Sequence, residues 1–357
     1  MYSKSRIDKM EVELTPNRFI GGAQPCYIIA EIGQNHQGEM SIAMELIKTA
    51  KQSNCDCVKF QKSYATSKFT QSALARPYVS QHSFGSTYGE HKAALELTDE
   101  QFHFLQRYSQ NEGITFSASA MDLKSVDFLA SINVPFIKIG SGDTNNFPLI
   151  RHVASKNKPV IYSTGMHDIG IIQSGYELLL SNKPLVILHC VSSYPTPIEE
   201  INLHVLKTYE TLFTRAIIGY SGHEEGTVPT LASVALGAKV VERHITLSKT
   251  MKGNDHRCSL EPAELAVMVE QIRQVERSLG SATKKRQQSE EACFMKLGKS
   301  IVARKQIEKG HIIEKSDMDV KVAEPNGLEA HNFDLLVGKR AKQCIPFDFP
   351  IQADDIY

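Results

Sequence analysis

The stretch Pro135-Phe-Ile-Lys-Ile-Gly-Ser-Gly-Asp143 contains the pattern that decides the fold. Its first five residues form a short apolar run, interrupted by Lys138, of the kind found in buried β-strands. Glycine, serine and aspartate end the run, and a helix-type segment begins after Asn146. A strand that passes through such a turn into a helix is the repeating unit of a parallel sheet.

Seven further units of this kind lie on either side of it, with predicted strands at 27–31, 57–61, 114–118, 159–163, 185–190, 216–220 and 239–243. Helical periodicity is clearest at 40–52, 99–110, 123–131 and 262–279, and a long loop is expected before 99–110. Thr98 with Gln101 predicts the helix start at 99. Eight units over about 250 residues match a closed (β/α)8 TIM barrel. An open doubly wound sheet is disfavoured, because no Gly-x-Gly-x-x-Gly follows the first strand.

The sequence changes character after residue 280. Residues 281–293 are polar and charged, as expected of a linker, and short β-type pieces follow at 300–304, 312–313, 318–321 and 337–341. We therefore predict an α/β barrel domain over 1–280, a linker over 281–293 and a small β-rich domain over 294–357. A domain of about 60 residues is marginally stable alone, so we expect it to dock on a partner surface.

Composition argues against several classes of partner. Lys plus Arg and Asp plus Glu number 40 each, so no global field favours nucleic acid or an acidic membrane. The N-terminus has no apolar signal-peptide core, and no apolar stretch approaches the roughly 20 residues that span a bilayer. The seven scattered cysteines indicate reduced, mostly buried thiols. We expect a soluble, cytoplasmic protein with no nucleic-acid or membrane partner.

Polar side chains concentrate at the C-terminal ends of the predicted strands, where barrel enzymes carry their reacting groups. Lys59 and Lys138 fall on two different strands, and a lysine pointing into a barrel mouth must meet an anion or lose its charge. The pair therefore predicts an anionic substrate, and the serines beside glycine turns suit phosphate oxygens. The alternative is that the lysines extend to water and the serines cap helices.

His223 and His244 end the seventh and eighth predicted strands, which are neighbours. Two imidazoles on adjacent strands can reach one divalent ion, with Glu31 and Asp255 as nearby carboxylates. Two protein ligands leave positions for substrate and water, which fits a Lewis-acid role better than a structural site. The alternative is a pair of histidines satisfied in the core or on the surface.

Longer stretches resemble the N-acetylneuraminate (sialic acid) synthase family, and its animal-type, phosphate-forming members in particular. They include Ala30-Glu-Ile-Gly-Gln-Asn-His-Gln-Gly38, Lys59-Phe-Gln-Lys62, Gly219-Tyr-Ser-Gly-His223, Glu242-Arg-His-Ile-Thr246 and Lys252-Gly-Asn-Asp255. The resemblance implies condensation of phosphoenolpyruvate with N-acetylmannosamine 6-phosphate, giving N-acetylneuraminate 9-phosphate and phosphate. Mannose 6-phosphate, free N-acetylmannosamine and other aldoses remain alternative acceptors. A non-catalytic or ice-interacting protein is the rival class, which the polar barrel mouth and the charged C-terminal domain disfavour.

The resemblance also implies roles for individual residues. Glu31 matches the catalytic carboxylate, and His223 and His244 match the ligands of a divalent ion, manganese or magnesium. The phosphoenolpyruvate pocket is matched by Lys59, Ser119, Lys138, Ser141, Ser163, Ser192 and Ser221. The amino-sugar site is matched by Gln61, Tyr194 and Asp255.

The C-terminal region resembles the antifreeze-like (SAF) domain, which in this family covers the barrel mouth of a second subunit in a domain-swapped homodimer. Bacterial members place an arginine of this domain in the partner's sugar site, where this chain has Val322 beside Lys321. The departure implies that the sugar phosphate is held elsewhere. We expect the long loop after the second strand to hold it, although an ordinary solvated loop is the alternative. The candidates there are Lys62, Lys68, Arg76, His82 and Lys92.

Overall fold

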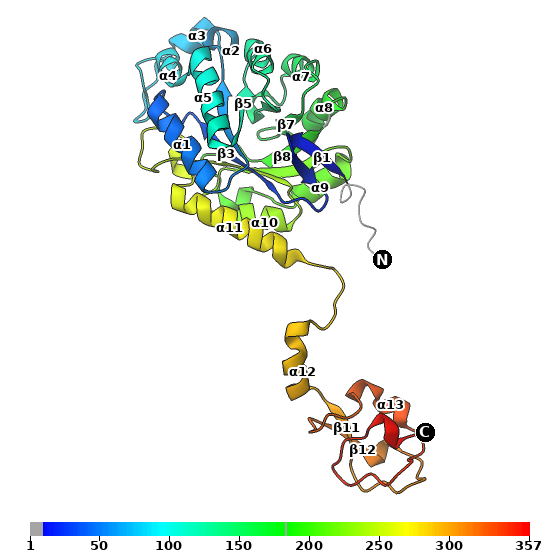
Figure 1. Cartoon of the computed structure of the whole chain (residues 1–357). Helices are drawn as coiled ribbons and strands as arrows, with labels where there is room; N and C mark the ends of the chain where they lie inside the picture. Colours follow the sequence, from blue (N-terminus) through cyan, green and yellow to red (C-terminus); the bar gives the residue numbers. More distant parts are fainter. Residues whose placement is uncertain (1–9, 183) are drawn as a thin grey trace. The chain divides into compact units, whose positions relative to one another are not determined.

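The computed structural model describes residues 10–182 and 184–357. The chain divides after Gly280 into two compact units (Figure 1). Residues 1–9 of the predicted barrel domain lie outside the described residues. Among the described residues, no helix combines the length and the apolar character needed to cross a bilayer.

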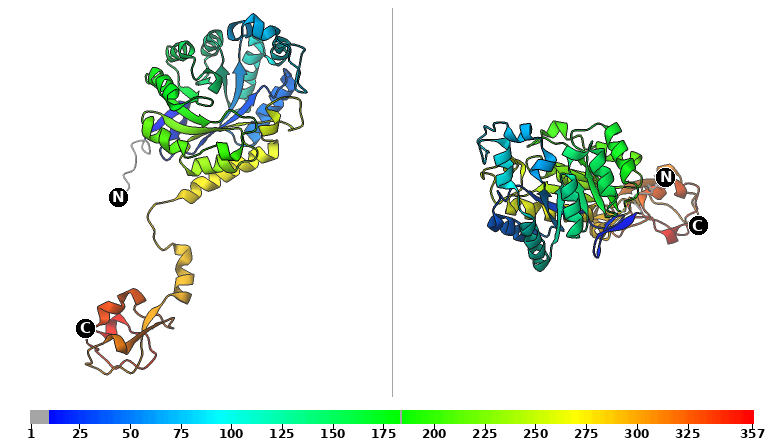
Figure 2. Two further views of the ribbon diagram at one scale, coloured as in Figure 1. Left: turned by 180° about the vertical axis from the view of Figure 1, so that it is seen from behind. Right: turned by 90° about the horizontal axis from the view of Figure 1, so that it is seen from above.

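Eight parallel strands close into a barrel in the first unit, which confirms the predicted fold (Figures 1 and 2). They are β3 Tyr27–Gly33, β4 Cys57–Lys62, β5 Thr115–Ala120, β6 Ile137–Ile139, β7 Val160–Ser163, β8 Leu185–Cys190, β9 Ile217–Gly222 and β10 Val240–His244. Each strand pairs with the next in the chain, and β10 pairs with β3 to close the ring. The closing register places His244 opposite Glu31.

The helices that alternate with these strands surround the barrel (Figure 2). They are α1 Met40–Gln52, α5 Asp99–Glu112, α6 Leu123–Ser131, α7 Phe147–Ala154, α8 Ile169–Leu179, α9 Val205–Leu212, α10 Val228–Ala235 and α11 Pro262–Leu279. Thr98 caps α5 and forms a capping box with Gln101, as predicted. The long loop expected after β4 instead contains three short helices: α2 Ala65–Lys68, α3 Gln71–Ala75 and α4 Tyr88–Leu95.

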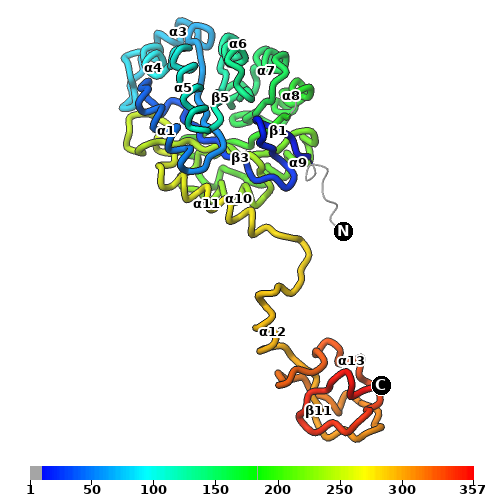
Figure 3. Tube along the Cα trace, viewed as in Figure 1, coloured from blue at the N-terminus to red at the C-terminus, as the bar shows by residue number. Residues whose placement is uncertain are grey.

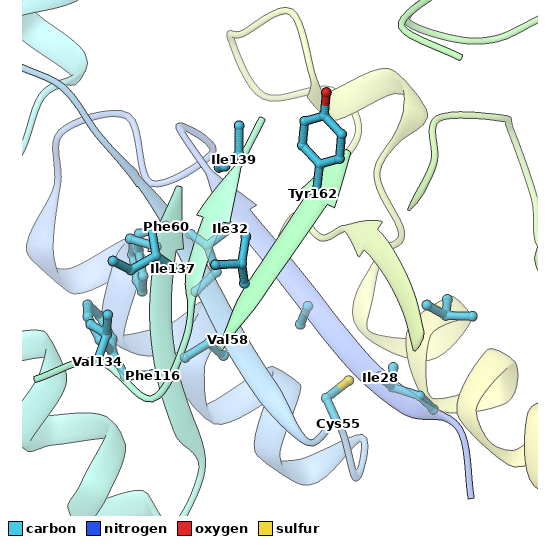
Figure 4. Packing of buried hydrophobic residues seen from close by; sticks show 14 of the residues in the cluster. Ile28, Ile32, Cys55, Val58, Phe60, Phe116, Val134, Ile137, Ile139 and Tyr162 are labelled. Atoms are coloured by element: carbon cyan, nitrogen blue, oxygen red, sulfur yellow. The ribbon is translucent and has the colours of Figure 1, made fainter. Parts of the chain in front are cut away.

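Side-chain alternation along each strand separates two cores. In β4, Val58 and Phe60 face the helices, and Phe60 stacks on Phe116 of β5 with ring centroids 5.4 Å apart (Figure 4). Cys57 of the same strand faces the barrel interior instead. Lys59 and Gln61, which share its parity, therefore also point inward.

An N-terminal hairpin, which the sequence analysis did not foresee, adds to the interior core. It consists of β1 Glu11–Thr15 and β2 Arg18–Gly21, paired antiparallel. Leu14 and Ile20 are buried and join the interior apolar cluster of residues at the N-terminal halves of the strands. The apolar filling of this half leaves the inward-facing polar side chains at the opposite end of the barrel.

The second unit, whose chain trace is drawn in Figure 3, has its own core. It contains a short antiparallel pair, β11 Ser300–Ala303 and β12 Met318–Lys321. It also contains α12 Glu291–Leu297 and α13 Phe333–Leu336. The predicted piece at 312–313 forms an isolated bridge from Ile312 to Arg340 rather than a strand. The stretch predicted as a linker, 281–293, is helical at its end, because α12 begins at Glu291.

Candidate functional site

A cavity of about 650 Å³ opens at the C-terminal ends of the barrel strands, a size that suits a small ligand. Because the strands are parallel, these ends meet on one face of the barrel. Each strand contributes an inward side chain to the lining: Glu31, Lys59, Ser119, Lys138, Ser163, Cys190, Ser221 and His244, in chain order.

Two buried lysines and two buried glutamates form the centre of this cavity. Lys59 Nζ lies 2.5 Å from Glu31 Oε2 and donates to Ser119 Oγ at 2.8 Å. Lys138 Nζ donates to both oxygens of Glu242, at 2.9 and 3.0 Å, and Lys59 Nζ lies 3.6 Å from Glu242 Oε1. The four formal charges cancel, so the centre is electrically balanced without a ligand.

Burial and pairing act differently on the two carboxyl groups. Burial raises the pKa of Glu31, and Lys59 offsets only part of that effect. Burial would also raise the pKa of Glu242, but Lys138 and Lys59 outweigh it and lower that pKa to about 2. Glu242 therefore stays ionised as a counter-charge to the lysines, and of the two carboxylates Glu31 is the one that accepts a proton more readily.

Glu242 is a cavity residue that the sequence analysis did not single out. It precedes His244 by two positions on β10, so the two side chains share the inward face. This shared inward face was the feature of the sequence that could have identified Glu242 as a cavity residue. The partners of Glu242, however, come from β4 and β6, far away in the sequence.

The serines predicted to bind phosphoenolpyruvate line the same cavity as the lysines. They are Ser119, Ser141, Ser163, Ser192 and Ser221. Gly165 allows two of them to converge, since a Cβ there would lie 2.3 Å from Ser192 Oγ and 2.9 Å from Ser141 Oγ. The Gly165 N–H also donates to Ser141 Oγ at 3.0 Å. Hydroxyls and a backbone turn thus face the same space as the two ammonium groups.

His223 and His244 lie together at the cavity, with ring centroids 5.3 Å apart. His223 Nδ1 lies 3.0 Å from the Val191 carbonyl oxygen, so that nitrogen donates, and in the neutral ring Nε2 has a free lone pair. His244 Nδ1 is buried without a hydrogen-bond partner, and Asp255 Oδ2 lies 3.9 Å away. Unused imidazole nitrogens at this separation fit a divalent ion. Within residues 10–182 and 184–357, no three His, Cys, Asp or Glu side chains gather as a metal-holding group.

A buried ion pair connects the chain segments that carry these histidines. Arg243 and Glu224, the neighbours of His244 and His223, are fully buried, and Arg243 Nη1 lies 2.9 Å from Glu224 Oε1. Arg243 Nη2 also donates to the Glu224 carbonyl at 2.7 Å, and the Tyr220 hydroxyl donates to Glu224 Oε2 at 2.8 Å. This network connects β10 to the segment that follows β9, and so restrains the separation of the two histidines.

The three residues predicted to contact the amino sugar also line the cavity. Gln61 Nε2 donates to Glu31 Oε1 at 2.9 Å. The Tyr194 ring lies 4.2 Å from the His223 ring, measured between centroids, and burial raises the pKa of Asp255. These side chains therefore surround the histidine side of the cavity.

Of the five residues predicted to hold a sugar phosphate, only Lys68 and Lys92 line the main cavity. Lys62 is buried on the opposite face of β4, 3.3 Å from Glu96 Oε1 and 3.2 Å from Asp99 Oδ1. The Arg76 guanidinium lies over the Tyr88 ring, and the Gly253 N–H donates to His82 Nδ1 at 3.3 Å. Lys62 fails to reach the cavity because its strand parity is opposite to that of Gln61.

Sequence profiles of known families match both units. The NeuB family profile matches residues 46–284, and the SAF domain profile matches residues 298–356. The chain is 49% identical over 346 residues to N-acetylneuraminate-9-phosphate synthase of Homo sapiens, covering 97% of this chain and 96% of that protein. It is 44% identical over 355 residues to N-acetylneuraminate-9-phosphate synthase of Drosophila melanogaster, covering 92% of this chain and 95% of that protein.

A solved structure with the same fold is that of N-acetylneuraminic acid synthetase from Leptospira borgpetersenii serovar Hardjo-bovis, in complex with citrate. It is 31% identical, with a TM-score of 0.68, and the match covers 80% of this chain and 95% of that one.

Proposed function

Because the chain belongs to the NeuB family, we propose that it condenses phosphoenolpyruvate with N-acetylmannosamine 6-phosphate to give N-acetylneuraminate 9-phosphate and phosphate. Relatives named for this product match nearly the whole chain at 44% to 49% identity. The observation that carries the proposal is the cavity itself. Two buried lysines, several hydroxyls and two histidines from successive strands face one space large enough for both substrates.

Lys59 and Lys138 are our candidates for binding the carboxylate and phosphate of phosphoenolpyruvate. Both are buried and act as point charges in a poorly solvated site. Since Glu31 and Glu242 already balance them, an incoming anion requires further positive charge. A divalent ion on His223 and His244, which we propose to be manganese or magnesium, would supply that charge and polarise the sugar aldehyde.

The remaining steps are assigned to side chains of this protein. Gln61, Tyr194 and Asp255 hold the open-chain sugar so that its C1 faces the methylene carbon of phosphoenolpyruvate. The electron pair of the phosphoenolpyruvate C=C bond forms the new C–C bond, the C1 carbonyl becomes an alkoxide that takes up a proton, and C2 of the former phosphoenolpyruvate is left cationic. Water then adds to C2 of the former phosphoenolpyruvate, and Glu31 takes the proton that this water loses. Phosphate leaves from the resulting hemiketal phosphate by C–O cleavage, next to Lys59 and Lys138.

We also propose that the protein acts as a domain-swapped homodimer in the cytoplasm. The second unit supports the dimer, because its surface exposes several large apolar side chains, among them Leu335, Phe347 and Phe349. The cysteines are free thiols, which fits a reducing compartment. Light scattering after size exclusion would test the dimer, since a monomer at micromolar concentration contradicts it.

Product mass is the direct test of the reaction. The protein is incubated with phosphoenolpyruvate, Mn²⁺ or Mg²⁺, and one of four acceptors: N-acetylmannosamine 6-phosphate, mannose 6-phosphate, free N-acetylmannosamine or another aldose phosphate. We expect the first to give the nine-carbon 9-phosphate with one phosphate released per product. Phosphate release only with a shorter aldose phosphate would contradict the proposal and indicate a different condensing enzyme.

A further inference from the structure

Three lysines that the proposed reaction steps do not use also line the cavity: Lys68, Lys92 and Lys252. Lys252 Nζ lies over the Phe84 ring, 4.6 Å from its centroid. Lys68 is the last residue of α2 and is exposed at the cavity rim, whereas Lys92 lies on α4 and is half-buried. The cavity therefore has outer cations in addition to the balanced centre.

The hydrogen-bond partners of Lys68 and Lys92 are uncharged. Lys68 Nζ lies 2.8 Å from Met121 Sδ, a weak acceptor, and Lys92 Nζ donates to Gln34 Oε1 at 3.0 Å. Lys62, by contrast, is paired with Glu96 and Asp99. Over the described part of the chain, neither Lys68 nor Lys92 forms an ion pair with a carboxylate, so each keeps donors for a ligand.

Two of the carboxylates that line this cavity, Asp122 and Asp143, have other partners. Asp122 accepts from the Tyr64 N–H at 2.7 Å and caps α6, and Asp143 accepts from Asn146 Nδ2 at 2.9 Å. Burial and the charge of Lys68 lower the pKa of Lys92, which indicates that the two cations lie close enough to repel one another. A pair of like charges held together in a cavity favours an anion between them.

The two lysines are carried by packed helices rather than by a free loop. A capping box of Thr87 and Glu90 fixes the start of α4. The Phe69 ring, next to Lys68, packs edge-on against Tyr88 of α4 with centroids 5.4 Å apart. His91 and Leu95 are the buried residues of α4. These contacts fix the backbone positions from which the Lys68 and Lys92 side chains extend. Less conformational entropy is therefore lost when the two side chains bind a ligand.

We propose that Lys68 and Lys92 bind the 6-phosphate of the sugar substrate and so make the enzyme prefer the phosphorylated sugar. The inference rests on the proposed function, which places the sugar aldehyde near His223 and His244. The 6-phosphate lies at the other end of that sugar chain, so its cations must line the same cavity away from the centre. A phosphate dianion offers three acceptor oxygens, enough for two ammonium groups.

The test compares Lys68→Gln, Lys92→Gln and the double variant with wild type at saturating phosphoenolpyruvate. The matched control is Lys124→Gln, because Lys124 lies over the nearby Tyr64 ring at 3.9 Å and does not line the cavity. For N-acetylmannosamine 6-phosphate we expect kcat/KM to fall about 10-fold per lysine, chiefly through KM, as for a lost hydrogen bond to a charged group. KM for phosphoenolpyruvate and kcat/KM for free N-acetylmannosamine should change less than about 2-fold.

Two outcomes would overturn the inference. One is an unchanged KM for the sugar phosphate in the double variant, and the other is an equal loss of kcat/KM with N-acetylmannosamine 6-phosphate and with free N-acetylmannosamine. If free N-acetylmannosamine is not turned over, the kinetic comparison with the free sugar is replaced by calorimetric titration of each variant with N-acetylmannosamine 6-phosphate. Wild type and Lys124→Gln should then bind alike, and the double variant more weakly by roughly 100-fold. Failure of the proposed function is seen separately, as wild-type protein that makes no nine-carbon product at all.

Discussion

Lys59 lies 2.5 Å from a carboxylate oxygen of Glu31, yet burial still raises the pKa of Glu31. An ion pair alone would lower this pKa, so burial and the like charge of Glu242 outweigh the effect of Lys59. The neighbouring Glu242 is held ionised by two lysines, with a pKa of about 2. The pKa values of two carboxyl groups in one cavity are thus shifted in opposite directions, which is typical of sites that transfer protons.

Replacing Glu31 should slow turnover more than it weakens binding. In Glu31→Gln the amide keeps the approximate shape of the carboxyl group but no longer accepts a proton, so we expect kcat to fall by roughly 100-fold or more. KM for both substrates should change little, because Lys59 and Gln61 remain in place. Steady-state phosphate release measures both constants, and an unaltered kcat would remove Glu31 from the mechanism.

Metal removal should reversibly abolish activity through His223 and His244. Treatment with a chelator is expected to inactivate the protein, and Mn²⁺ or Mg²⁺ should restore it. The independent readout is Mn²⁺ binding followed by electron paramagnetic resonance, in which His223→Ala/His244→Ala should lose the bound ion. His256→Ala serves as the control, since that histidine lies in the loop after β10 and does not line the main cavity. Full activity in metal-free protein would contradict the two-histidine site.

The position of a residue along its strand, odd or even, decides whether its side chain faces the barrel interior. This alternation was not applied to Lys62 when the sugar-phosphate residues were predicted. Lys59 and Gln61 share a parity and both line the cavity, whereas Lys62 has the opposite parity and pairs with Glu96 outside the barrel. That placement could have been anticipated. The role of Glu242 could not, because it depends on two lysines brought alongside only when the barrel closes.

Helix α8 packs so closely on β7 that its middle requires glycine. A Cβ on Gly175 would lie 2.2 Å from the Tyr162 hydroxyl, and that hydroxyl is held by donating to the Thr144 carbonyl at 2.9 Å. We therefore expect Gly175→Ala to lower the free energy of unfolding by about 1–3 kcal/mol, as in other overpacked cores. Urea denaturation followed by circular dichroism measures the difference.

Gly170→Ala is the matched control for that change. Gly170 lies on the same helix, and a Cβ there would meet nothing within 4 Å. This variant should be neutral or stabilised by up to about 1 kcal/mol, because alanine has the higher helix propensity. If both variants lost the same free energy of unfolding, general disruption of the helix, rather than contact with Tyr162, would explain the loss in Gly175→Ala.

Long periodic segments were predicted well, and short ones were not. Helices 40–52, 123–131 and 262–279 have the bounds expected from the sequence, since an apolar stripe repeats over several turns. Helices α2 and α3 have only 4 and 5 residues, too few to show a period, and they fell in the predicted loop. The β1–β2 hairpin was missed because its stability comes from burial of Leu14 and Ile20 against the barrel.

At the scale of the whole molecule, we expect the stability of the second unit to decrease at acid pH because of one buried carboxylate, Asp317. This buried carboxylate lies 2.6 Å from Lys305 Nζ and accepts from the Glu314 N–H at 2.8 Å. Burial would raise the pKa of Asp317, but these contacts lower it to about 2. The folded pKa is thus below the unfolded value of about 3.9, so its stabilisation is complete above about pH 4 and is lost as the pH falls toward 2.

We expect this loss to amount to about 1–2 kcal/mol, reduced by the solvent around Lys305. Hydrogen exchange of the β11 and β12 amides in the full chain, between pH 5 and 2.5, measures it after correction for intrinsic rates. Asp317→Asn should flatten the pH dependence, whereas Asp319→Asn on exposed β12 should not. If stability fell equally steeply with pH in wild type and in Asp317→Asn, another titratable group would be responsible for the loss of stability.

The pairing of β10 with β3 has a consequence for how the protein is made. The two strands come from opposite ends of the first unit, so during translation β3 keeps one unpaired edge until residue 244 has left the ribosome. Such long-range pairing is slow to form, and an open edge invites contact with other nascent chains. Biosynthetic yield should therefore depend on chaperones that shield the unfinished ring, and on how quickly ribosomes translate the segment that completes it.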